Sequence, residues 1–150
     1  MPVYTCVTTE KTLADGTKAA LAAEITKIHS SVTGAPTALV HVIFHDLPAT
    51  NVFTDSSPSR PLLITGVIRA GRADGDKVRL ATDISSRSSR IAGIPEARIR
   101  VNIADRPARF VVEGGRVMPE PGAEDDWLAE TTSRSAESGS HHDPSPSQLL

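Results

Sequence analysis

The chain has 150 residues, of which 39% are hydrophobic and 3% aromatic, and its formal net charge is -2. This length is sufficient for one domain with its own hydrophobic core. The balanced charge and the scarcity of aromatic rings argue against nucleic-acid binding, which relies on basic surfaces and on stacking side chains.

Neither a membrane segment nor a targeting signal is evident in the sequence. No apolar stretch approaches the roughly 20 residues that cross a bilayer, and the N-terminus lacks a basic region followed by an apolar one. Cys6 is the sole cysteine and cannot form an internal disulfide, so we interpret it as a small buried hydrophobic residue. We expect a cytoplasmic protein with no membrane and no nucleic-acid partner.

The first third of the chain predicts a strand, a helix and a second strand. Residues 2–8 are rich in β-formers. From Asp15 to Thr33 the apolar residues recur at helical spacing, with Asp15 as a candidate N-cap and Gly34 as a stop signal. Residues 37–45 form a nearly continuous apolar and β-branched run, which is typical of a strand covered on both faces.

The same pattern then repeats after a polar connection. Residues 46–60 predict a long surface loop, and strand, helix and strand follow over residues 62–68, 74–91 and 98–103. Two βαβ units in tandem predict an α/β (α+β) fold whose four-stranded sheet carries both helices on one face. The opposite face would be apolar and bare, and we expect identical subunits to cover it.

The C-terminal part predicts a hairpin and an unstructured tail. Gly114 and Gly115 form a two-residue turn signal between residues 110–112 and 116–118. From Glu130 onward serine, charge and proline dominate. We therefore expect a single domain over residues 1–130 and a disordered tail over 131–150, in which His141 and His142 are solvated.

Pro2 follows the initiator methionine, and removal of Met1 would give the chain an N-terminal secondary amine. An α-amino group has an ordinary pKa of about 7.7–8.0, and burial beside a cation lowers that pKa. Such an amine can act as a catalytic acid or base near neutral pH.

A set of residues spread along most of the chain forms a recognisable pattern: Pro2, Val3, Tyr4, Ile25, Thr26, His29, Pro48, Asn51, Val52, Phe53, Arg69, Gly71, Arg72, Glu113, Gly115, Arg116, Pro119, Pro121, Gly122, Glu124 and Trp127. In these residues the chain resembles the cis-3-chloroacrylic acid dehalogenase group of the tautomerase superfamily, a family of N-terminal-proline enzymes. The resemblance implies homotrimers of two-βαβ subunits, matching the assembly that the bare sheet face calls for. No cofactor and no metal are expected, because amine, carboxylate and guanidinium groups complete the expected chemistry.

Arg69, Arg72 and His29 are the candidates for binding a small carboxylate. The two arginines stand three residues apart where a strand ends, so their guanidinium groups could converge on one carboxylate. The alternative is a solvated pair bonded to surface acids. His29 lies at the edge of its helix's apolar stripe, where it could reach a ligand at the sheet margin. The resemblance implies that it contacts the substrate carboxylate, and the alternative is a partly buried histidine bonded to backbone.

His41 and His45 share one sheet face but are about 13 Å apart along their strand, too far to share a metal ion. We interpret them as structural or interfacial.

Glu113 and Asn102 are the candidate residues for adding water to a substrate. The resemblance implies that Glu113 orients or deprotonates a water beside a tyrosine, but Asn102 occupies the tyrosine's position and cannot titrate as a phenol does. Gly114 also replaces a tyrosine of the dehalogenase, and the loop before the third strand is two residues shorter. These departures put efficient hydrolytic dehalogenation in doubt.

The sequence thus predicts a tautomerase acting on small enol or 2-oxo carboxylic acids, with weaker hydratase or dehalogenase activity on 3-haloacrylates. Pro2, Glu113, Arg69, Arg72 and His29 are the predicted catalytic residues, and Asn102 joins His29 and the arginines in binding the substrate. Two alternatives remain open: a cis-3-chloroacrylic acid dehalogenase proper, and a non-catalytic trimeric protein that binds carboxylates.

Overall fold

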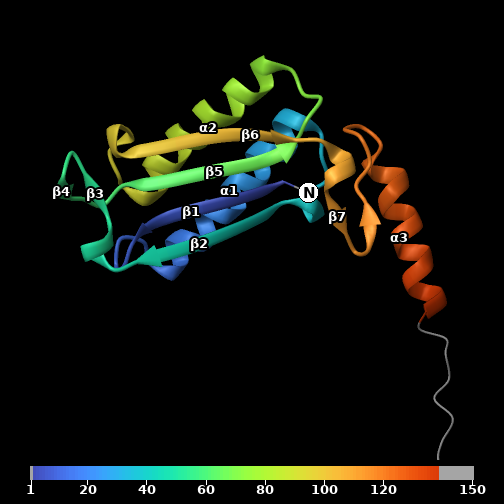
Figure 1. Ribbon diagram of the computed structural model, residues 1–150, viewed down its shortest axis with the longest axis horizontal. Coiled ribbons are helices and arrows are strands. Elements are labelled where there is room, and N and C mark those ends of the chain that lie inside the picture. Colours follow the sequence, from blue (N-terminus) through green and yellow to red (C-terminus); the bar gives the residue numbers. More distant parts are fainter. Residues whose placement is uncertain (1, 139–150) are drawn as a thin grey trace, which may run out of the picture.

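A four-stranded mixed sheet forms the centre of the protein (Figure 1). The computed structural model describes the backbone of residues 2–138 and the side chains of residues 2–133. The strand order is β2-β1-β5-β6, where β1 is Val3–Thr9, β2 His41–Leu47, β5 Leu62–Arg69 and β6 Ile99–Arg106. β1 pairs in parallel with β2, β5 pairs in parallel with β6, and β1 and β5 are antiparallel. The two predicted βαβ units are therefore confirmed.

Helices α1 (Asp15–Thr33) and α2 (Asp74–Ala92) lie together on one face of the sheet (Figure 1). Gly34 ends α1 in the left-handed conformation, and its N–H donates to the Ser30 carbonyl, as the stop signal predicts. The N-cap prediction is wrong, because Ala14 occupies that position and Asp15 is the first helical residue. Asp15 still stabilises the helix, because its negative charge in the first turn interacts favourably with the helix dipole.

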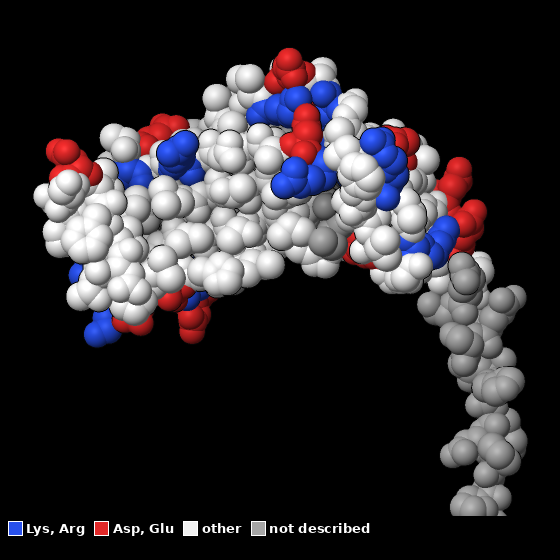
Figure 2. All heavy atoms as spheres, in the orientation of Figure 1, with Lys and Arg blue, Asp and Glu red and all other residues white. Residues whose placement is uncertain are grey.

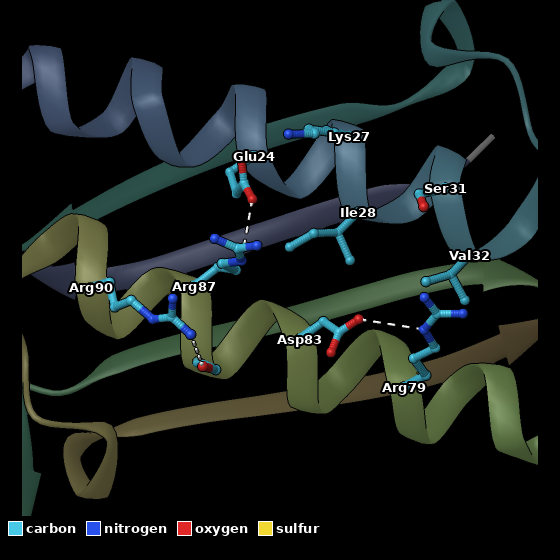
Figure 3. Close-up of a pocket in the computed structure, with 10 residues that line it drawn as sticks. Glu24, Lys27, Ile28, Ser31, Val32, Arg79, Asp83, Arg87 and Arg90 are labelled. Carbon is cyan, nitrogen blue, oxygen red and sulfur yellow. Dashed lines mark hydrogen bonds and ion pairs between the residues drawn. The ribbon is translucent and has the colours of Figure 1, made fainter.

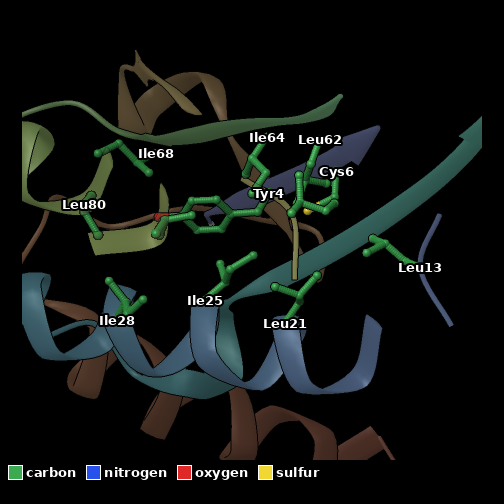
Figure 4. Close-up of a cluster of buried hydrophobic side chains, with 12 residues drawn as sticks. Tyr4, Cys6, Leu13, Leu21, Ile25, Ile28, Leu62, Ile64, Ile68 and Leu80 are labelled. Atoms are coloured by element: carbon green, nitrogen blue, oxygen red, sulfur yellow. The ribbon is translucent and has the colours of Figure 1, made fainter. Parts of the chain in front are cut away.

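The hydrophobic core fills the layer between the sheet and these helices (Figure 4). Tyr4 and Cys6 project into it from β1, and the helices contribute aliphatic side chains such as Leu21, Ile25 and Leu80. Cys6 is 1% exposed, and burial raises the pKa of its thiol to about 12. It is therefore the small buried residue that the sequence predicts, and a thiol that is buried and protonated is unreactive.

No helix or strand among residues 2–138 forms a layer over the opposite face of the sheet. Figure 2 shows this face as mostly uncharged, with acidic and basic side chains gathered toward its margins. Ile43 of β2 and Leu63 of β5 are 44% and 38% exposed there. An open apolar sheet face of this kind normally packs against a partner.

Short elements connect and extend the sheet. The loop after β2 contains the small hairpin of β3 (Phe53–Thr54) and β4 (Ser57–Pro58), and the predicted C-terminal hairpin is formed by β7 (Val112–Glu113) and β8 (Arg116–Val117). Four short 3-10 turns lie in the connections, at Thr37–Leu39, Ala49–Asn51, Glu96–Arg98 and Ala108–Phe110.

A third helix, α3 (Glu124–Ser138), follows the hairpin and was not expected from the sequence. Trp127 anchors it in a second buried cluster with Leu39 and Met118, and its indole N–H donates to the Val117 carbonyl at 3.0 Å. Three acidic residues in its first turn stabilise the helix through their favourable interaction with its dipole. The helix thus continues past residue 131, where the sequence predicts the tail to begin. The rest of that tail, residues 139–150 with both C-terminal histidines, lies outside the described residues.

Candidate active site

One end of the sheet gathers most of the predicted site residues. β1 begins there and the antiparallel β5 ends there, so Pro2, which precedes Val3, lies beside the strand end that carries Arg69. Pro2 is fully buried, and its carbonyl accepts a hydrogen bond from the His41 amide at 3.0 Å. Figure 1 shows the N-terminus at this end, beside the β7–β8 hairpin.

His29 reaches the same end from the last turns of α1 and is 2% exposed. It is therefore buried, not at the sheet margin where the sequence placed it. Its Nδ1 is 2.8 Å from the hydroxyl oxygen of Tyr4. Burial, together with the positive charges of Arg72 and Arg69, lowers the pKa of His29 to about 4. The imidazole is consequently neutral at physiological pH.

The two arginines meet a carboxylate that belongs to the chain itself. Arg69 is 3% exposed and donates to Glu124 and, at 2.6 Å, to the Pro119 carbonyl. Arg72 donates to the Thr33 carbonyl at the end of α1 and lies at 3.5 Å from the same Glu124 oxygen. The alternative of a solvated pair bonded to surface acids is wrong, because the acid that binds the arginines is buried. Binding of a substrate carboxylate by the arginines stays a prediction.

Glu124 is held as an anion at the start of α3. Its second carboxylate oxygen accepts from the Gly122 amide at 2.7 Å. Burial acts to raise the pKa of Glu124, but its own backbone amide and the Arg69 guanidinium outweigh burial and lower that pKa overall. The charge of Arg69 is thus largely compensated, whereas Arg72 has 12% of its side chain exposed, and its one acid contact among the described residues is the 3.5 Å contact with Glu124.

Glu113 enters this end of the sheet from β7. One of its carboxylate oxygens lies 3.3 Å from Nε2 of His41, and the other is buried without a hydrogen-bond partner among the described residues. A buried carboxylate oxygen without a donor is unusual and is suited to a water or ligand hydroxyl. His41, interpreted from sequence as structural or interfacial, therefore contacts a candidate catalytic residue.

Asn102 is the one predicted site residue that the structure does not bring to this cluster. It pairs with Thr65 in the middle of β6 and lines a shallow cavity of about 310 Å³ on the open sheet face. Its side chain faces away from the helices, so within one chain it is separate from Pro2 and the arginines.

A groove between α1 and α2 is an alternative site, with a volume of about 350 Å³ (Figure 3). Its acids are engaged with neighbouring arginines, Glu24 with Arg87 and Asp83 with Arg79, each at 3.6 Å. Exposed pairs of this type contribute about 0–1 kcal/mol and are common on solvated helices. None of the predicted site residues lines the groove, so we place the candidate site at the sheet end.

Tyr4 and Glu124 are the residues whose partners sequence reasoning missed. Both were recognised as motif positions, but a buried hydroxyl beside His29 and a buried acid beside Arg69 are contacts across 25 and 55 residues. The described residues contain no cluster of His, Cys, Asp or Glu suited to a metal ion, and within the same part of the chain no helix has the length and apolar character of a membrane span.

Comparison with known proteins agrees with this fold. The chain belongs to the family described as "Putative oxalocrotonate tautomerase enzyme", whose profile matches residues 1–132. It therefore lies within the tautomerase superfamily and is tautomerase-like. No curated protein sequence matches it.

Solved structures give the same assignment. N1, described as a member of the cis-3-chloroacrylic acid dehalogenase family, is 27% identical with a TM-score of 0.83, and the match covers 91% of this chain and 99% of N1. Native Ps01740 is 33% identical (TM-score 0.72; 74% and 99% covered). The asymmetric trimer of the wild-type fused 4-OT named F6 is 26% identical (TM-score 0.72; 77% and 94% covered).

Protonation of His29 is expected to make stability depend on pH. A free histidine has a pKa near 6.5, whereas buried His29 has a pKa of about 4. Between these values the unfolded chain binds a proton that the folded chain does not, so the free energy of unfolding decreases as pH falls, by about 3 kcal/mol in all. Urea unfolding at pH 7 and pH 4.5 measures this. The pH dependence should weaken in His29→Gln and persist in His45→Gln, an exposed histidine; identical dependence in both variants would contradict the assignment.

Proposed function

We propose that this protein is an N-terminal-proline tautomerase that acts on small enol or 2-oxo carboxylic acids. The observation that supports the proposal is the convergence of buried Pro2 and His29 with the partly buried Arg72 at one end of the sheet. A basic amine, a neutral imidazole and a guanidinium group are the parts that such a proton transfer needs.

In the proposed reaction the unprotonated Pro2 nitrogen takes the hydroxyl proton of the enol. The carbonyl forms as the C=C electrons move to carbon, and the same proton is returned to that carbon from the Pro2 ammonium. Arg72 and His29 hold the substrate carboxylate. Arg69, whose charge is largely compensated by Glu124, holds that carboxylate, which in turn lies 3.5 Å from Arg72.

The proposal requires that Met1 is removed, because the Pro2 nitrogen is otherwise a peptide nitrogen without basicity. Proline is a small residue behind the initiator methionine, which favours removal. The intact mass of the purified protein tests this requirement, and a retained methionine would favour the non-catalytic carboxylate-binding alternative.

Hydration of 3-haloacrylates is a second candidate activity, favoured by the buried oxygen of Glu113 that has no partner among the described residues. In that reaction protonated Pro2 acts as an acid at the α-carbon, Glu113 directs water to the β-carbon, and loss of hydrogen halide completes dehalogenation. Asn102 does not assist the water as a titratable group, because its amide does not titrate. Within one chain it also lies away from Pro2.

An activity screen at several pH values distinguishes the candidates. Purified, processed protein is assayed with phenylenolpyruvate and with both isomers of 3-chloroacrylate. Tautomerisation should rise as Pro2 loses its proton, and hydration should fall over the same interval. Chloride release from cis-3-chloroacrylate as fast as any ketonisation would favour the dehalogenase instead, and no turnover of any of these acids would contradict the enzyme assignment.

A homotrimer is the assembly we propose, because the open sheet face exposes Ile43 and Leu63 and several similar structures are described as trimers. Asn102 lies on that face, so it could approach Pro2 only from a neighbouring subunit. Sedimentation equilibrium should give three times the chain mass of 15.9 kDa; a monomer would contradict the proposal.

A further inference from the structure

Tyr4 and His29 form a buried pair beneath the candidate site. The two side chains are 0% and 2% exposed, and the Tyr4 hydroxyl lies 2.8 Å from Nδ1 of His29. Their rings meet edge to face, with centroids 5.7 Å apart and an interplanar angle of 73°. In Figure 4 the Tyr4 ring lies across the core, and its hydroxyl points toward the end where Ile28 lies.

The protonation states leave one sensible arrangement of hydrogens. Burial raises the pKa of the Tyr4 phenol, so its oxygen keeps the proton, and His29 is neutral with a pKa of about 4. No other hydrogen bond of the Tyr4 hydroxyl is found in the described part of the chain. If His29 donated from Nδ1, the phenol O–H would be a buried donor without an acceptor, at a cost of about 1–3 kcal/mol.

We propose that Tyr4 is a positioning residue that donates its hydroxyl hydrogen bond to Nδ1 of His29 and thereby fixes the imidazole in the tautomer with its proton on Nε2. Nε2 makes no hydrogen bond to any described residue, and it is then a permanent donor. A neutral donor beside Arg72 adds a hydrogen bond to a bound carboxylate without releasing or taking up a proton. This role in substrate binding rests on the proposed function, whereas the tautomer assignment does not.

Gly66 sets the position of the Tyr4 ring. The two residues face each other across β1 and β5, and a Cβ on Gly66 would lie 2.5 Å from Cε1 and 2.9 Å from Cδ1 of the ring. Any larger residue at position 66 must therefore displace Tyr4 and its hydroxyl. The closeness of strand and ring is what brings the phenol within hydrogen-bonding distance of α1.

Nuclear magnetic resonance of histidine-labelled protein tests the tautomer directly. In the wild-type protein at pH 7, the nitrogen resonances of His29 should show a protonated Nε2 and an unprotonated, hydrogen-bonded Nδ1. In Tyr4→Phe, the Nδ1 resonance should shift because its donor is gone, and the second tautomer should gain population. Thr8→Val is the matched control, since it removes a buried hydroxyl on the same strand that bonds to the Pro61 carbonyl at the far end.

A proton on Nδ1 in the wild-type protein would overturn the proposal, and so would His29 resonances that are unchanged in Tyr4→Phe. The wild-type spectrum gives this answer even where Tyr4→Phe fails to fold. With a substrate in hand, Tyr4→Phe should raise KM about two- to ten-fold and leave kcat nearly unchanged, which corresponds to the loss of part of one hydrogen bond. Absence of all turnover would refute the proposed function, but the spectra would still decide the tautomer.

Discussion

Replacement of Pro2 by alanine is expected to lower kcat/KM for enol tautomerisation by about 10²–10⁴-fold, the range contributed by a well-placed acid or base. Alanine retains an N-terminal amine after processing, but that amine is primary and lacks the ring that fixes the direction of the nitrogen lone pair. Pro2 is also buried and hydrogen-bonded to β2, so the site is shaped around the fixed proline ring and has little room for an amine that rotates. Steady-state ketonisation of phenylenolpyruvate measures the effect.

Pro58→Ala is the matched control, because this proline is exposed in β4 at a distance from the proposed machinery. Both variants are to be checked by intact mass, so that failed removal of Met1 is not taken for loss of the catalytic amine. Full activity in a processed Pro2→Ala protein would show that another group moves the proton.

Replacement of Glu124 by glutamine is expected to destabilise the fold by about 3–5 kcal/mol, the usual cost of leaving a buried ion without its partner. Glu124 and Arg69 are 5% and 3% exposed, and no other acid of the described residues contacts the guanidinium. The loss also removes the link between β5 and the start of α3. Urea unfolding followed by circular dichroism measures the free energy of unfolding. That free energy falls linearly with urea concentration, with a slope proportional to the surface that unfolding exposes.

Glu130→Gln, in the same helix, is the control, because Glu130 is 68% exposed in its pair with Arg116 and should cost less than about 1 kcal/mol. A double replacement of Arg69 by methionine and Glu124 by leucine should recover most of the stability, as apolar substitutes often do for buried ion pairs. A cost for Glu124→Gln no larger than that of the control would show that Arg69 is adequately solvated.

Much of the fold could be predicted from sequence because two helices and four strands carry clear periodicity. The bounds of α1, Asp15–Thr33, agree with the apolar spacing and with Gly34 as its end. Parallel pairing within each βαβ unit follows from its helical crossover, and the right-handed sense of both crossovers places the two helices on one face. The antiparallel contact between β1 and β5 joins the two units, and local pattern alone does not specify it.

Helix α3 was missed for a physical reason. Its sequence is acidic and serine-rich and has no continuous apolar stripe, so local propensity favours a loop. Its stability comes from tertiary contacts: Trp127 is buried against Leu39 and Met118, and Arg116 donates to the Trp127 carbonyl at 2.9 Å. Contacts of that kind lie outside the reach of a local pattern.

The sequence indicated which residues the candidate site contains, but not which charged side chains pair with one another there. The resemblance singled out Pro2, His29, Arg69, Arg72 and Glu113, and the topology brings them to one end of the sheet. The sequence could not show that Glu124 binds the arginines, because that pairing depends on how the hairpin and α3 return to the end of β5. Roles for these residues, and for Asn102 on the open face, stay predictions until activity is measured.

Trapping of a 2-oxo acid on the N-terminus is the most direct test of a reactive Pro2 amine in a carboxylate-binding site. An unprotonated secondary amine condenses with the ketone, losing water to form an iminium ion, which cyanoborohydride reduces to a stable adduct. Peptide mapping of protein treated with pyruvate at pH 7 should locate one saturable adduct on Pro2, strongly reduced in Arg72→Ala. Modification of surface lysines alone, or labelling of Pro2 that is unaffected by loss of Arg72, would contradict the account.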